Sequence, residues 1–418
     1  MNRGRAAGFG HFGQARPYAP PLARHAPMPL SRPLRAGMVG GGPGAFIGDV
    51  HRRAVRMDGL ATLVAGVFSS DPDKSRAYAA ELGVERAYGS YEEMADAEAS
   101  RPDGVEVVSV VTPNWLHAPA ALAFVERGIS VVCDKPMTTT LEDAERIVEA
   151  VRQHDVLFAL THNYTGYPLV KQARALVQDG ALGEVRKVVA AYNQGWLSQP
   201  IEQDGMKQAV WRTDPAKAGA GALGDIGSHA ENLAAYVTGL HLDRLCADVR
   251  TFVPGRQIDD DASVLLRYAA PDGGTAPGGV LHCSQVAAGL ENDLMLRVSG
   301  TEATIEWRQE APNALRFLPR EGQERVYRRG HDDLAPAARH AARLPSGHPE
   351  AFNEAFANVY SNALRTLAAR IAGDEPDPLD LDFPTAEDGA RGVHFILTAL
   401  ESGRREGWVD ASYTPPGA

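Results

Sequence analysis

The sequence has few cysteines, no excess of basic residues and no long apolar run. Only three cysteines occur among 418 residues, too few and too scattered for a zinc knuckle or a disulfide framework. The formal net charge of -11 disfavours nucleic acid and anionic membrane surfaces as partners. No apolar run is long enough to cross a bilayer. We therefore expect a protein of the reducing cytoplasm that binds neither nucleic acid nor membrane.

The N-terminal segment also lacks the apolar stretch of a secretion signal. Residues 1–32 are rich in Arg, Gly, Ala and Pro, which predicts a flexible arm. The arm is either an unstructured leader, with the working chain beginning near Met28, or a segment that wraps a neighbouring subunit. The rest of the chain is long enough for two domains with separate cores.

Residues 33–160 alternate apolar strands with helices. We expect strands at 33–39, 61–68, 105–111, 129–133 and 156–160, and helices at 46–60, 71–82, 91–99, 119–127 and 141–154. This repetition predicts an α/β domain with a doubly wound parallel sheet of the Rossmann type. Ligands of such sheets bind at the carboxyl ends of the strands, where the side chains considered next are placed.

Residues 161–418 have a different pattern, in which strands follow one another with few helices between them. We expect a helix at 167–178 and strands at 185–192, 245–253, 262–268, 279–286, 293–299 and 303–307. A second, α+β domain with an antiparallel or mixed sheet follows from this pattern. Residues 308–349 are expected to be a polar connection. Helices at 350–373 and 386–403 and a strand at 408–409 close the chain, and the last helix could pack back towards the first domain.

A glycine-rich turn joins the first strand to the first helix. Gly40-Gly41-Gly42-Pro43-Gly44-Ala45 fits the pattern G-x-G-x-x-A, and an alternative register ends at Gly48. Glycines let the backbone approach a pyrophosphate, and the N–H groups of a helix start favour its negative charge. A tight loop without a ligand would have the same pattern. The predicted dinucleotide contacts are Gly40, Gly42, Gly44, Ala45, Phe46 and Ile47.

The residues after the second strand bear on the choice of dinucleotide. Ser69 and Ser70 lie roughly where an acidic side chain would bind an adenosine 2′-hydroxyl, while Asp71 comes later and Lys74 lies nearby. This mixture tolerates a 2′-phosphate without requiring one. The expected cofactor is therefore NAD or NADP, with Ser69, Ser70 and Lys74 among its contacts.

Polar residues also follow the third and fourth expected strands. Thr112, Pro113, Asn114 and His117 could line the ribose and nicotinamide, or Asn114 could only cap the next helix. Asp134-Lys135-Pro136 closes a buried strand at the ligand edge, and we expect Asp134 and Lys135 to contact the cofactor. Lys135 could take part in proton transfer there, or it could be a solvated lysine at the edge of the sheet.

A second cluster lies far along the chain. Asp225 and His229 are four residues apart after a glycine-rich approach, so they can share one face near a helix start. An aspartate beside a histidine orients the ring, and histidine can take a proton from an alcohol. The alternatives are a helix-terminal ion pair or a capping aspartate. No metal site is expected, because His229 and Glu231 diverge on a helix.

Several aromatic and polar residues could line a polyol pocket by stacking and hydrogen bonding. Tryptophan is common in cores and interfaces, so these residues could equally be structural. The candidates are Tyr164, Trp196, Lys207, Trp211 and Arg212.

Taken together, residues from about 35 to the end resemble the glucose–fructose oxidoreductase and inositol dehydrogenase family, Gfo/Idh/MocA. Asp134-Lys135-Pro136 resembles the family's Glu-Lys-Pro, Asp225-x-x-x-His229 follows a glycine run, and Thr112-Pro-Asn114-x-x-His117 also matches. The resemblance implies catalytic roles for Lys135, Asp225 and His229 at the nicotinamide. It also implies an open, mostly antiparallel second sheet that is often used to build oligomers, here a dimer or tetramer.

The sequence departs from the family in three places. Asp134 replaces the usual glutamate, the glycine turn is enlarged, and Asn232 stands where a second acid often follows the histidine. We place Asn232 with Tyr164, Trp211 and Arg212 among the expected substrate contacts.

The resemblance implies hydride transfer between NAD(P) and a secondary alcohol of a sugar, polyol or inositol-like substrate. His229 would take the hydroxyl proton, Lys135 would hydrogen-bond the oxygen, and Asp225 would orient the histidine. Two alternatives use the same scaffold. A glycoside hydrolase or epimerase would return the hydride to its substrate, with no net redox change. A non-catalytic dinucleotide sensor would lack the proton-handling groups, all of which this sequence has.

Overall fold

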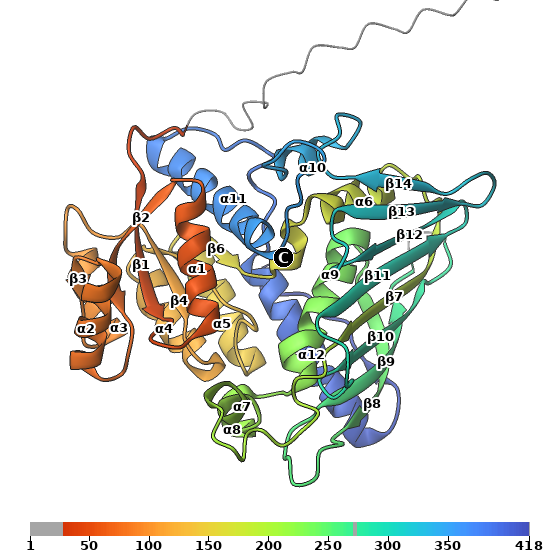
Figure 1. The fold of residues 1–418 in the computed structure, drawn as a ribbon, viewed down its shortest axis with the longest axis horizontal. Coiled ribbons are helices and arrows are strands. Elements are labelled where there is room, and N and C mark those ends of the chain that lie inside the picture. The colour runs from red at the N-terminus through yellow and green to blue at the C-terminus, as the bar shows by residue number, and fades with distance from the viewer. Residues whose placement is uncertain (1–27, 271–273, 418) are drawn as a thin grey trace, which may run out of the picture.

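The structure, a computed structural model, describes residues 28–270 and 274–417. Most of the predicted arm, residues 1–27, lies outside the described residues. Two sheets stand apart in the molecule with helices between them (Figure 1). Across the described ranges, no helix combines the length and the apolar character that a membrane span requires.

The first sheet is parallel and has six strands, which confirms the predicted doubly wound domain. In the order of the sheet these are β3 (Arg86–Ala87), β2 (Ala61–Val67), β1 (Leu34–Gly40), β4 (Val107–Val111), β5 (Ser130–Cys133) and β6 (Phe158–Leu160). The short β3 is an addition to the predicted strands. Helices cover both faces, and β4 is buried along its whole length, as expected of a strand with two covered faces.

The helices of this domain lie close to the predicted ranges, although α1 ends three residues earlier than expected and α4 begins and ends two residues earlier. They are α1 (Phe46–Met57), α2 (Pro72–Leu82), α3 (Tyr91–Ala99), η1 (Asn114–Leu116), α4 (His117–Val125) and α5 (Leu141–Gln153). Asp71, Ser90 and Thr140 cap α2, α3 and α5 by accepting hydrogen bonds from backbone N–H groups. α1 has no such side-chain cap. Its first N–H groups are therefore available to a ligand.

The second sheet has nine strands and is mostly antiparallel, as predicted. In the order of the sheet they are β14 (Arg325–Arg328), β13 (Ala314–Pro319), β12 (Ala303–Arg308), β11 (Asp293–Gly300), β7 (Val185–Asn193), β10 (Gly278–Ser284), β9 (Asp261–Tyr268), β8 (Leu242–Arg250) and β15 (Val409–Asp410). Among the described strands of this second sheet, only β7 and β10 pair in parallel. The prediction of a polar connection at 308–349 is wrong, because β13, β14 and the short helix α10 (Pro336–His340) lie there.

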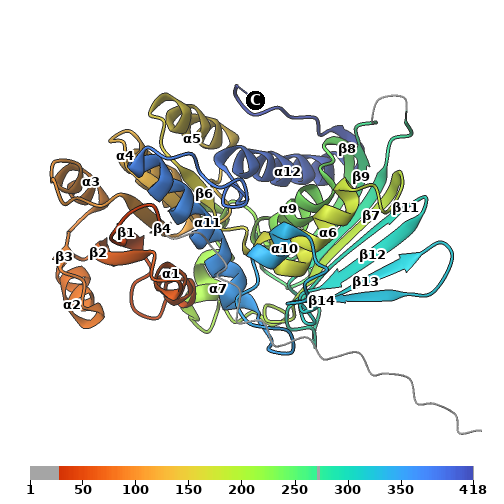
Figure 2. The ribbon, with the colours of Figure 1, turned by 90° about the horizontal axis from the view of Figure 1, so that it is seen from above.

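The described helices gather on one face of the second sheet. η2 (Asn163–Gly166), α6 (Pro168–Gln178), η3 (Leu223–Gly227) and α9 (Ser228–Thr238) lie between the two sheets. Figure 2 shows the helices on one side of the nine strands and open space on the other. Burial alternates along β9 because alternate side chains point to these two sides.

The last two long helices tie the domains together. α11 (Phe352–Ala372) packs on α1, where Phe356 and Tyr360 join a core with Val50 and Ala54. α12 (Ala386–Arg405) lies against α5 and β8, so it contacts both domains. Two short helices that the sequence pattern does not predict, α7 (Lys207–Arg212) and α8 (Pro215–Ala218), lie at the lower edge of the space between the sheets (Figure 1).

Candidate active site

A large cavity lies between the carboxyl ends of the parallel strands and the helices of the second domain. Its volume of about 1620 Å³ exceeds the roughly 300–1,000 Å³ of a usual small-molecule pocket. The β1–α1 turn, the ends of β2, β4 and β5, η3, α9 and the end of β7 contribute to its wall. The cavity therefore has room for a dinucleotide together with a smaller molecule.

Glycines of the β1–α1 turn are required by the backbone. Gly40 has a φ of 90°, and a Cβ there would lie 2.4 Å from the carbonyl oxygen of Val111. A Cβ on Gly48 would lie 2.4 Å from Cα of Gly41, so the close approach of helix to strand occurs at Gly48. The register ending at Gly48 thus describes this packing better than the one ending at Ala45.

The predicted contacts of the glycine turn nearly all reach the cavity. Gly40, Gly42, Ala45, Phe46 and Ile47 line it, whereas Gly44 lies in the turn without contributing to the wall. Phe46 stands 70% exposed at the start of α1. Together with the uncapped α1, this turn could hold a pyrophosphate on backbone N–H groups.

The corner after β2 is lined by hydroxyls and one ammonium group. Ser69, Ser70 and Lys74 line the cavity there. The carboxylate of Asp71 instead accepts hydrogen bonds from the backbone N–H groups of Asp73 and Lys74, at 3.0 and 3.2 Å. The Lys74 ammonium lies 3.5 Å from the other carboxylate oxygen of Asp71, so an adenosine ribose bound in this corner would meet hydroxyls and a lysine that is paired with Asp71.

Of the polar residues after β4, three line the cavity and one is buried outside it. Thr112, Pro113 and Asn114 line the cavity. The Asn114 side chain donates to the carbonyl of Ala218 at 3.1 Å and caps neither η1 nor α4, so the capping alternative is wrong. His117 is buried, and its ring nitrogens lie 2.8 Å from the carbonyl oxygens of Pro136 and Thr112, where the ring joins two neighbouring loops.

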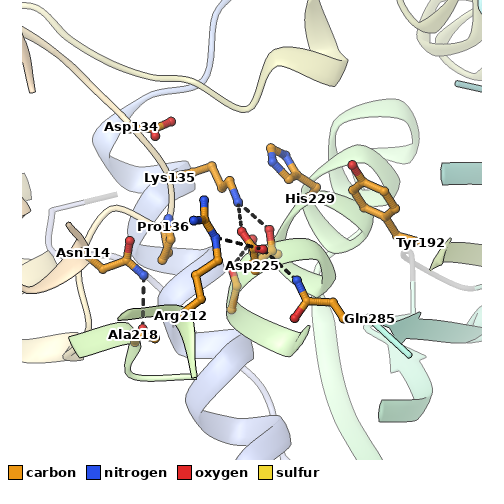
Figure 3. Close-up of polar contacts among 12 residues, drawn as sticks. Asn114, Asp134, Lys135, Pro136, Tyr192, Arg212, Ala218, Asp225, His229 and Gln285 are labelled. Atoms are coloured by element: carbon orange, nitrogen blue, oxygen red, sulfur yellow. Dashed lines mark hydrogen bonds and ion pairs between the residues drawn. The ribbon is translucent and has the colours of Figure 1, made fainter. Parts of the chain in front are cut away.

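Lys135 and Asp225 meet in the wall of the cavity, although 90 residues separate them. The Lys135 ammonium donates to Oδ1 of Asp225 at 2.8 Å and also to the Asp225 backbone carbonyl (Figure 3). The other carboxylate oxygen accepts from Gln285 at 2.7 Å and pairs with Arg212 at 3.5 Å. Burial favours a higher pKa for Asp225, but the charges of Lys135 and Arg212 and these hydrogen bonds outweigh it and lower the pKa to about 2.

The expected contact between Asp225 and His229 is wrong. Asp225 lies in η3, a π-turn that widens the chain just before α9 begins. Within the described part of the chain, the carboxylate is bonded to Lys135, Arg212 and Gln285, and the ring of His229 is not among its partners. Asp225 therefore positions the lysine rather than the histidine.

His229 lines the same cavity with a ring that is largely buried. Its Nδ1 lies 3.4 Å from Nδ1 of His162, and the ring packs edge-on against Tyr164 with centroids 4.8 Å apart. Burial, followed by the charge of Lys135 and the neighbouring His162, holds the pKa of His229 well below its usual value. The ring is therefore neutral at pH 7 and can accept a proton.

A chain of hydrogen bonds crosses the wall on the side of the second sheet. The hydroxyl of Tyr164 lies 2.5 Å from that of Tyr192, and Tyr192 donates to Oδ1 of Asn292 at 2.6 Å. Gln194 donates to the same oxygen at 2.8 Å and accepts from the Trp196 indole at 3.1 Å. All five side chains line the cavity.

Sequence reasoning placed two of these five residues, Tyr164 and Trp196, and missed the other three. Polar residues at the end of a strand could have indicated Tyr192 and Gln194, whereas no local signal marks Asn292. His162 and Gln285 were missed as well, since each contacts a catalytic candidate that is distant in sequence.

The remaining predicted substrate contacts separate into two places. Trp211 and Arg212 line the main cavity, where the guanidinium of Arg212 stacks over the Trp211 ring at 4.3 Å. Asn232 instead lines a second cavity, together with Tyr236 and residues of α12, so it is not brought to the site. The side chain of Lys207 lies outside the described part of the chain.

Two parts of the chain match known family descriptions. Residues 34–162 match an oxidoreductase family with an NAD-binding Rossmann fold, and residues 170–306 match the GFO/IDH/MocA C-terminal domain. An uncharacterized oxidoreductase of Bacillus subtilis, YfiI, is 30% identical over 388 residues, which are 91% of this chain and 98% of that protein. The chain belongs to the GFO/IDH/MocA family of oxidoreductases. The resemblance inferred from the sequence is thereby confirmed.

Two solved structures of relatives share the fold over nearly the whole chain. An oxidoreductase from Sinorhizobium meliloti is 45% identical with a TM-score of 0.82, covering 90% of this chain and 99% of that chain. An inositol dehydrogenase homologue from Azotobacter vinelandii, complexed with NADH and myo-inositol, is 35% identical with a TM-score of 0.83, covering 91% and 98%. Both sheets therefore belong to the family fold.

The residues of the turn fit the NAD that the family fold implies. The backbone-lined turn at Gly40 to Gly42 has no room for Cβ atoms, and the adjoining α1 is uncapped, unlike α2, α3 and α5. Backbone N–H groups and a helix start are the donors that a pyrophosphate needs. Thr112 to Asn114 and Lys135 then lie further along the same cavity, towards His229.

Proposed function

We propose that this oxidoreductase transfers hydride between a secondary alcohol of a sugar, polyol or inositol-like substrate and a bound nicotinamide dinucleotide. One observation carries the proposal. Lys135 from the dinucleotide domain and His229 from the second domain line one cavity that continues to the glycine turn. Nicotinamide, when bound, supplies the hydride acceptor. The A. vinelandii homologue, crystallised with NADH and myo-inositol, supports the choice of substrate class.

Lys135 is suited to hold the reacting oxygen. An ammonium group has three N–H donors, and two of them go to the carboxylate and carbonyl of Asp225. The third is left for the substrate hydroxyl. Because Asp225 remains ionised, its carboxylate and backbone carbonyl hold the lysine in this position.

His229 is suited to take the hydroxyl proton. The low pKa caused first by burial keeps the ring neutral, so a lone pair is available before the alcohol reacts. Donation by Lys135 to the same oxygen stabilises the negative charge that develops as the proton leaves. The two groups thus act on the same C–OH.

The hydrogen-bond chain from Tyr164 to Trp196 is suited to the other hydroxyls of a polyol. Its hydroxyl and amide groups both donate and accept, as the several hydroxyls of a sugar or inositol do. A substrate without these hydroxyls could not form hydrogen bonds with this chain, which discriminates against simple alcohols.

The corner after β2 supports use of both dinucleotides. Asp71, the first acidic residue after β2, is occupied as the cap of α2 and does not line the cavity, whereas Glu81 and Glu92 line it further along α2 and α3. Ser69, Ser70 and Lys74 can bond either a 2′-hydroxyl or a 2′-phosphate. We expect measurable activity with NAD and with NADP.

We also propose a homo-oligomer, a dimer or tetramer, formed through the open face of the nine-stranded sheet. Apolar side chains are exposed along this sheet, including Leu265 on β9 and Val326 on β14. Light scattering coupled to gel filtration tests the assembly, and a monomer at micromolar concentration would contradict it.

The three cysteines are unpaired, which supports a cytoplasmic location.

The test of function is a panel of inositols, polyols and sugars with NAD and NADP, read by NADH or NADPH absorbance. Wild type should oxidise at least one cyclic polyol or sugar, whereas Lys135→Ala and His229→Ala should not. His331→Ala, an exposed histidine, is the matched control and should retain activity. Turnover of a glycoside without net NADH would favour the redox-neutral alternative. Dinucleotide binding with no turnover of any kind would favour the sensor.

A further inference from the structure

The ring of His229 is held from behind by a second histidine that does not line the cavity. Nδ1 of His162 lies 3.4 Å from Nδ1 of His229, and the two rings meet edge to face with an interplanar angle of 83°. His162 is 2% exposed and follows β6. Since Asp225 is occupied by Lys135, Arg212 and Gln285, His162 takes the place at Nδ1 that an orienting carboxylate would have.

The backbone around His162 is firmly held. Its N–H donates to the carbonyl of Leu160 at 2.9 Å, and its own carbonyl accepts from the Thr165 hydroxyl at 2.9 Å. The preceding Thr161 donates to Asp134 at 2.8 Å, which ties this loop to the end of β5 beside Lys135. On the far side lies α12, where a Cβ added to Gly392 would stand 3.9 Å from Nε2 of His162. The ring therefore has a fixed place behind His229.

Two neutral histidines that face each other through Nδ1 must divide the roles of donor and acceptor. Burial, followed by the charge of Lys135, lowers the pKa of His162 to about 3, so both rings are neutral at pH 7. If His162 donates, Nε2 of His229 carries the remaining proton and cannot act as a base. If His229 donates, its Nε2 has a free lone pair on the cavity side.

We propose that His162 is a positioning residue that accepts the Nδ1–H of His229 and thereby fixes the tautomer in which Nε2 is the base. This inference rests on the proposed alcohol oxidation, because that reaction requires a basic Nε2. In the proposed oxidation the substrate O–H bond would break and its proton would bond to Nε2, while a bound dinucleotide would accept the hydride of the carbon, which would become a carbonyl. His229 then carries both ring protons, and the Nδ1–H remains bonded to His162.

A neutral partner differs from an aspartate in one useful respect. A carboxylate at Nδ1 would favour the imidazolium form and would protonate more of the base before substrate binds. Among the residues that the structure describes, the ring of His229 is faced by Lys135, His162, Tyr164 and Tyr192, and none of these four is an acid. His162 can therefore orient the ring and leave it neutral.

Three substitutions separate the hydrogen-bond role from packing. In His162→Asn the amide oxygen stands near the position of Nδ1 and can still accept. His162→Gln places its amide near the position of Nε2, and His162→Phe keeps a ring without an acceptor. We expect His162→Asn to retain kcat within about threefold of wild type. The kcat of His162→Phe and His162→Gln should fall by about tenfold or more, a loss typical of residues that orient a catalytic side chain without touching the substrate. KM for the dinucleotide should not change.

The tautomer itself can be read in the free protein. Long-range proton–nitrogen NMR of protein labelled with ¹⁵N-histidine distinguishes Nδ1–H from Nε2–H, and loss of signals in His229→Asn and His162→Asn assigns the two rings. We expect Nδ1–H for His229 in wild type and in His162→Asn, and Nε2–H or a mixture in His162→Phe. Melting temperature and dinucleotide binding confirm that each variant is folded.

The outcomes distinguish this inference from the proposed function. Wild-type His229 with Nε2–H, or a Phe variant with unchanged kcat and unchanged tautomer, would overturn the role of His162 even in an active enzyme. The predicted tautomer in a protein that oxidises no alcohol would leave the role of His162 intact and overturn the function. An Asn variant as impaired as Phe would show that the acceptor at Nδ1 is not what matters.

Discussion

Replacing Asp225 with asparagine should reveal how much the buried ion pair with Lys135 contributes. The side chains of Lys135 and Asp225 are 14% and 24% exposed, so solvent screens the pair only in part. The pKa of Asp225 falls from the usual 3.8 to about 2 in the folded protein. That difference corresponds to about 2–3 kcal/mol in the free energy of unfolding.

The sign of the pH dependence follows from the direction of this change. A carboxylate whose pKa is lower in the folded state stabilises the protein above its unfolded pKa, near pH 4, and stops doing so as pH falls through about 2. Asp225→Asn should therefore lose about 2–3 kcal/mol at pH 7. The difference from wild type should shrink steadily between pH 4 and pH 2.

Urea unfolding of both proteins across pH 2–7 measures this difference. Asp248→Asn is the matched control. The Asp248 side chain is 63% exposed and pairs with Arg250 on the surface. That pair should contribute less than about 1 kcal/mol to the free energy of unfolding. A constant difference between Asp225→Asn and wild type over the whole range would refute the reasoning. So would a loss at pH 7 no larger than that of the control.

Three further predictions concern the cavity. Gly42→Ala should weaken dinucleotide binding by about tenfold or more, because its Cβ would lie 2.1 Å from the carbonyl oxygen of Phe68. Calorimetry measures the dissociation constant. The control is Gly407→Ala, where a Cβ would meet nothing closer than 3.7 Å. Lys74→Glu should raise KM for NADP by about tenfold and KM for NAD much less, since only NADP carries a 2′-phosphate in that corner; equal changes would contradict the assignment. Asn292→Ala should raise KM for the alcohol by about tenfold, because it removes the acceptor shared by Tyr192 and Gln194, with dinucleotide KM unchanged; steady-state kinetics decide it.

The first domain could be predicted closely from sequence because its signals are local. Strand β4 is a run of buried valines around one serine, and capping residues such as Asp71 mark the helix starts. The hairpin β13–β14 was missed for an equally local reason. Its partly exposed strands carry charged residues such as Arg316, paired with Glu324, and such a composition is typical of a loop.

The catalytic candidates could be named from sequence, but their pairing could not. Residue spacing suggested that Asp225 orients His229. In the structure the π-turn at η3 and the end of β5 place the Asp225 carboxylate within hydrogen-bond distance of Lys135 instead. His162 has no local signature, because its role depends on a contact with a residue 67 positions away. Asn232 was misplaced since its side of α9 faces a different cavity.

The most direct measurement compares Lys135→Ala and His229→Ala with wild type at saturating dinucleotide, using a polyol that wild type oxidises. Dinucleotide affinity is measured for the same preparations. If the two side chains act together on one alcohol, both variants should bind the dinucleotide normally and lose about 100-fold or more in kcat. A variant that keeps the wild-type kcat, or one that fails only because it no longer binds dinucleotide, would contradict the proposed site.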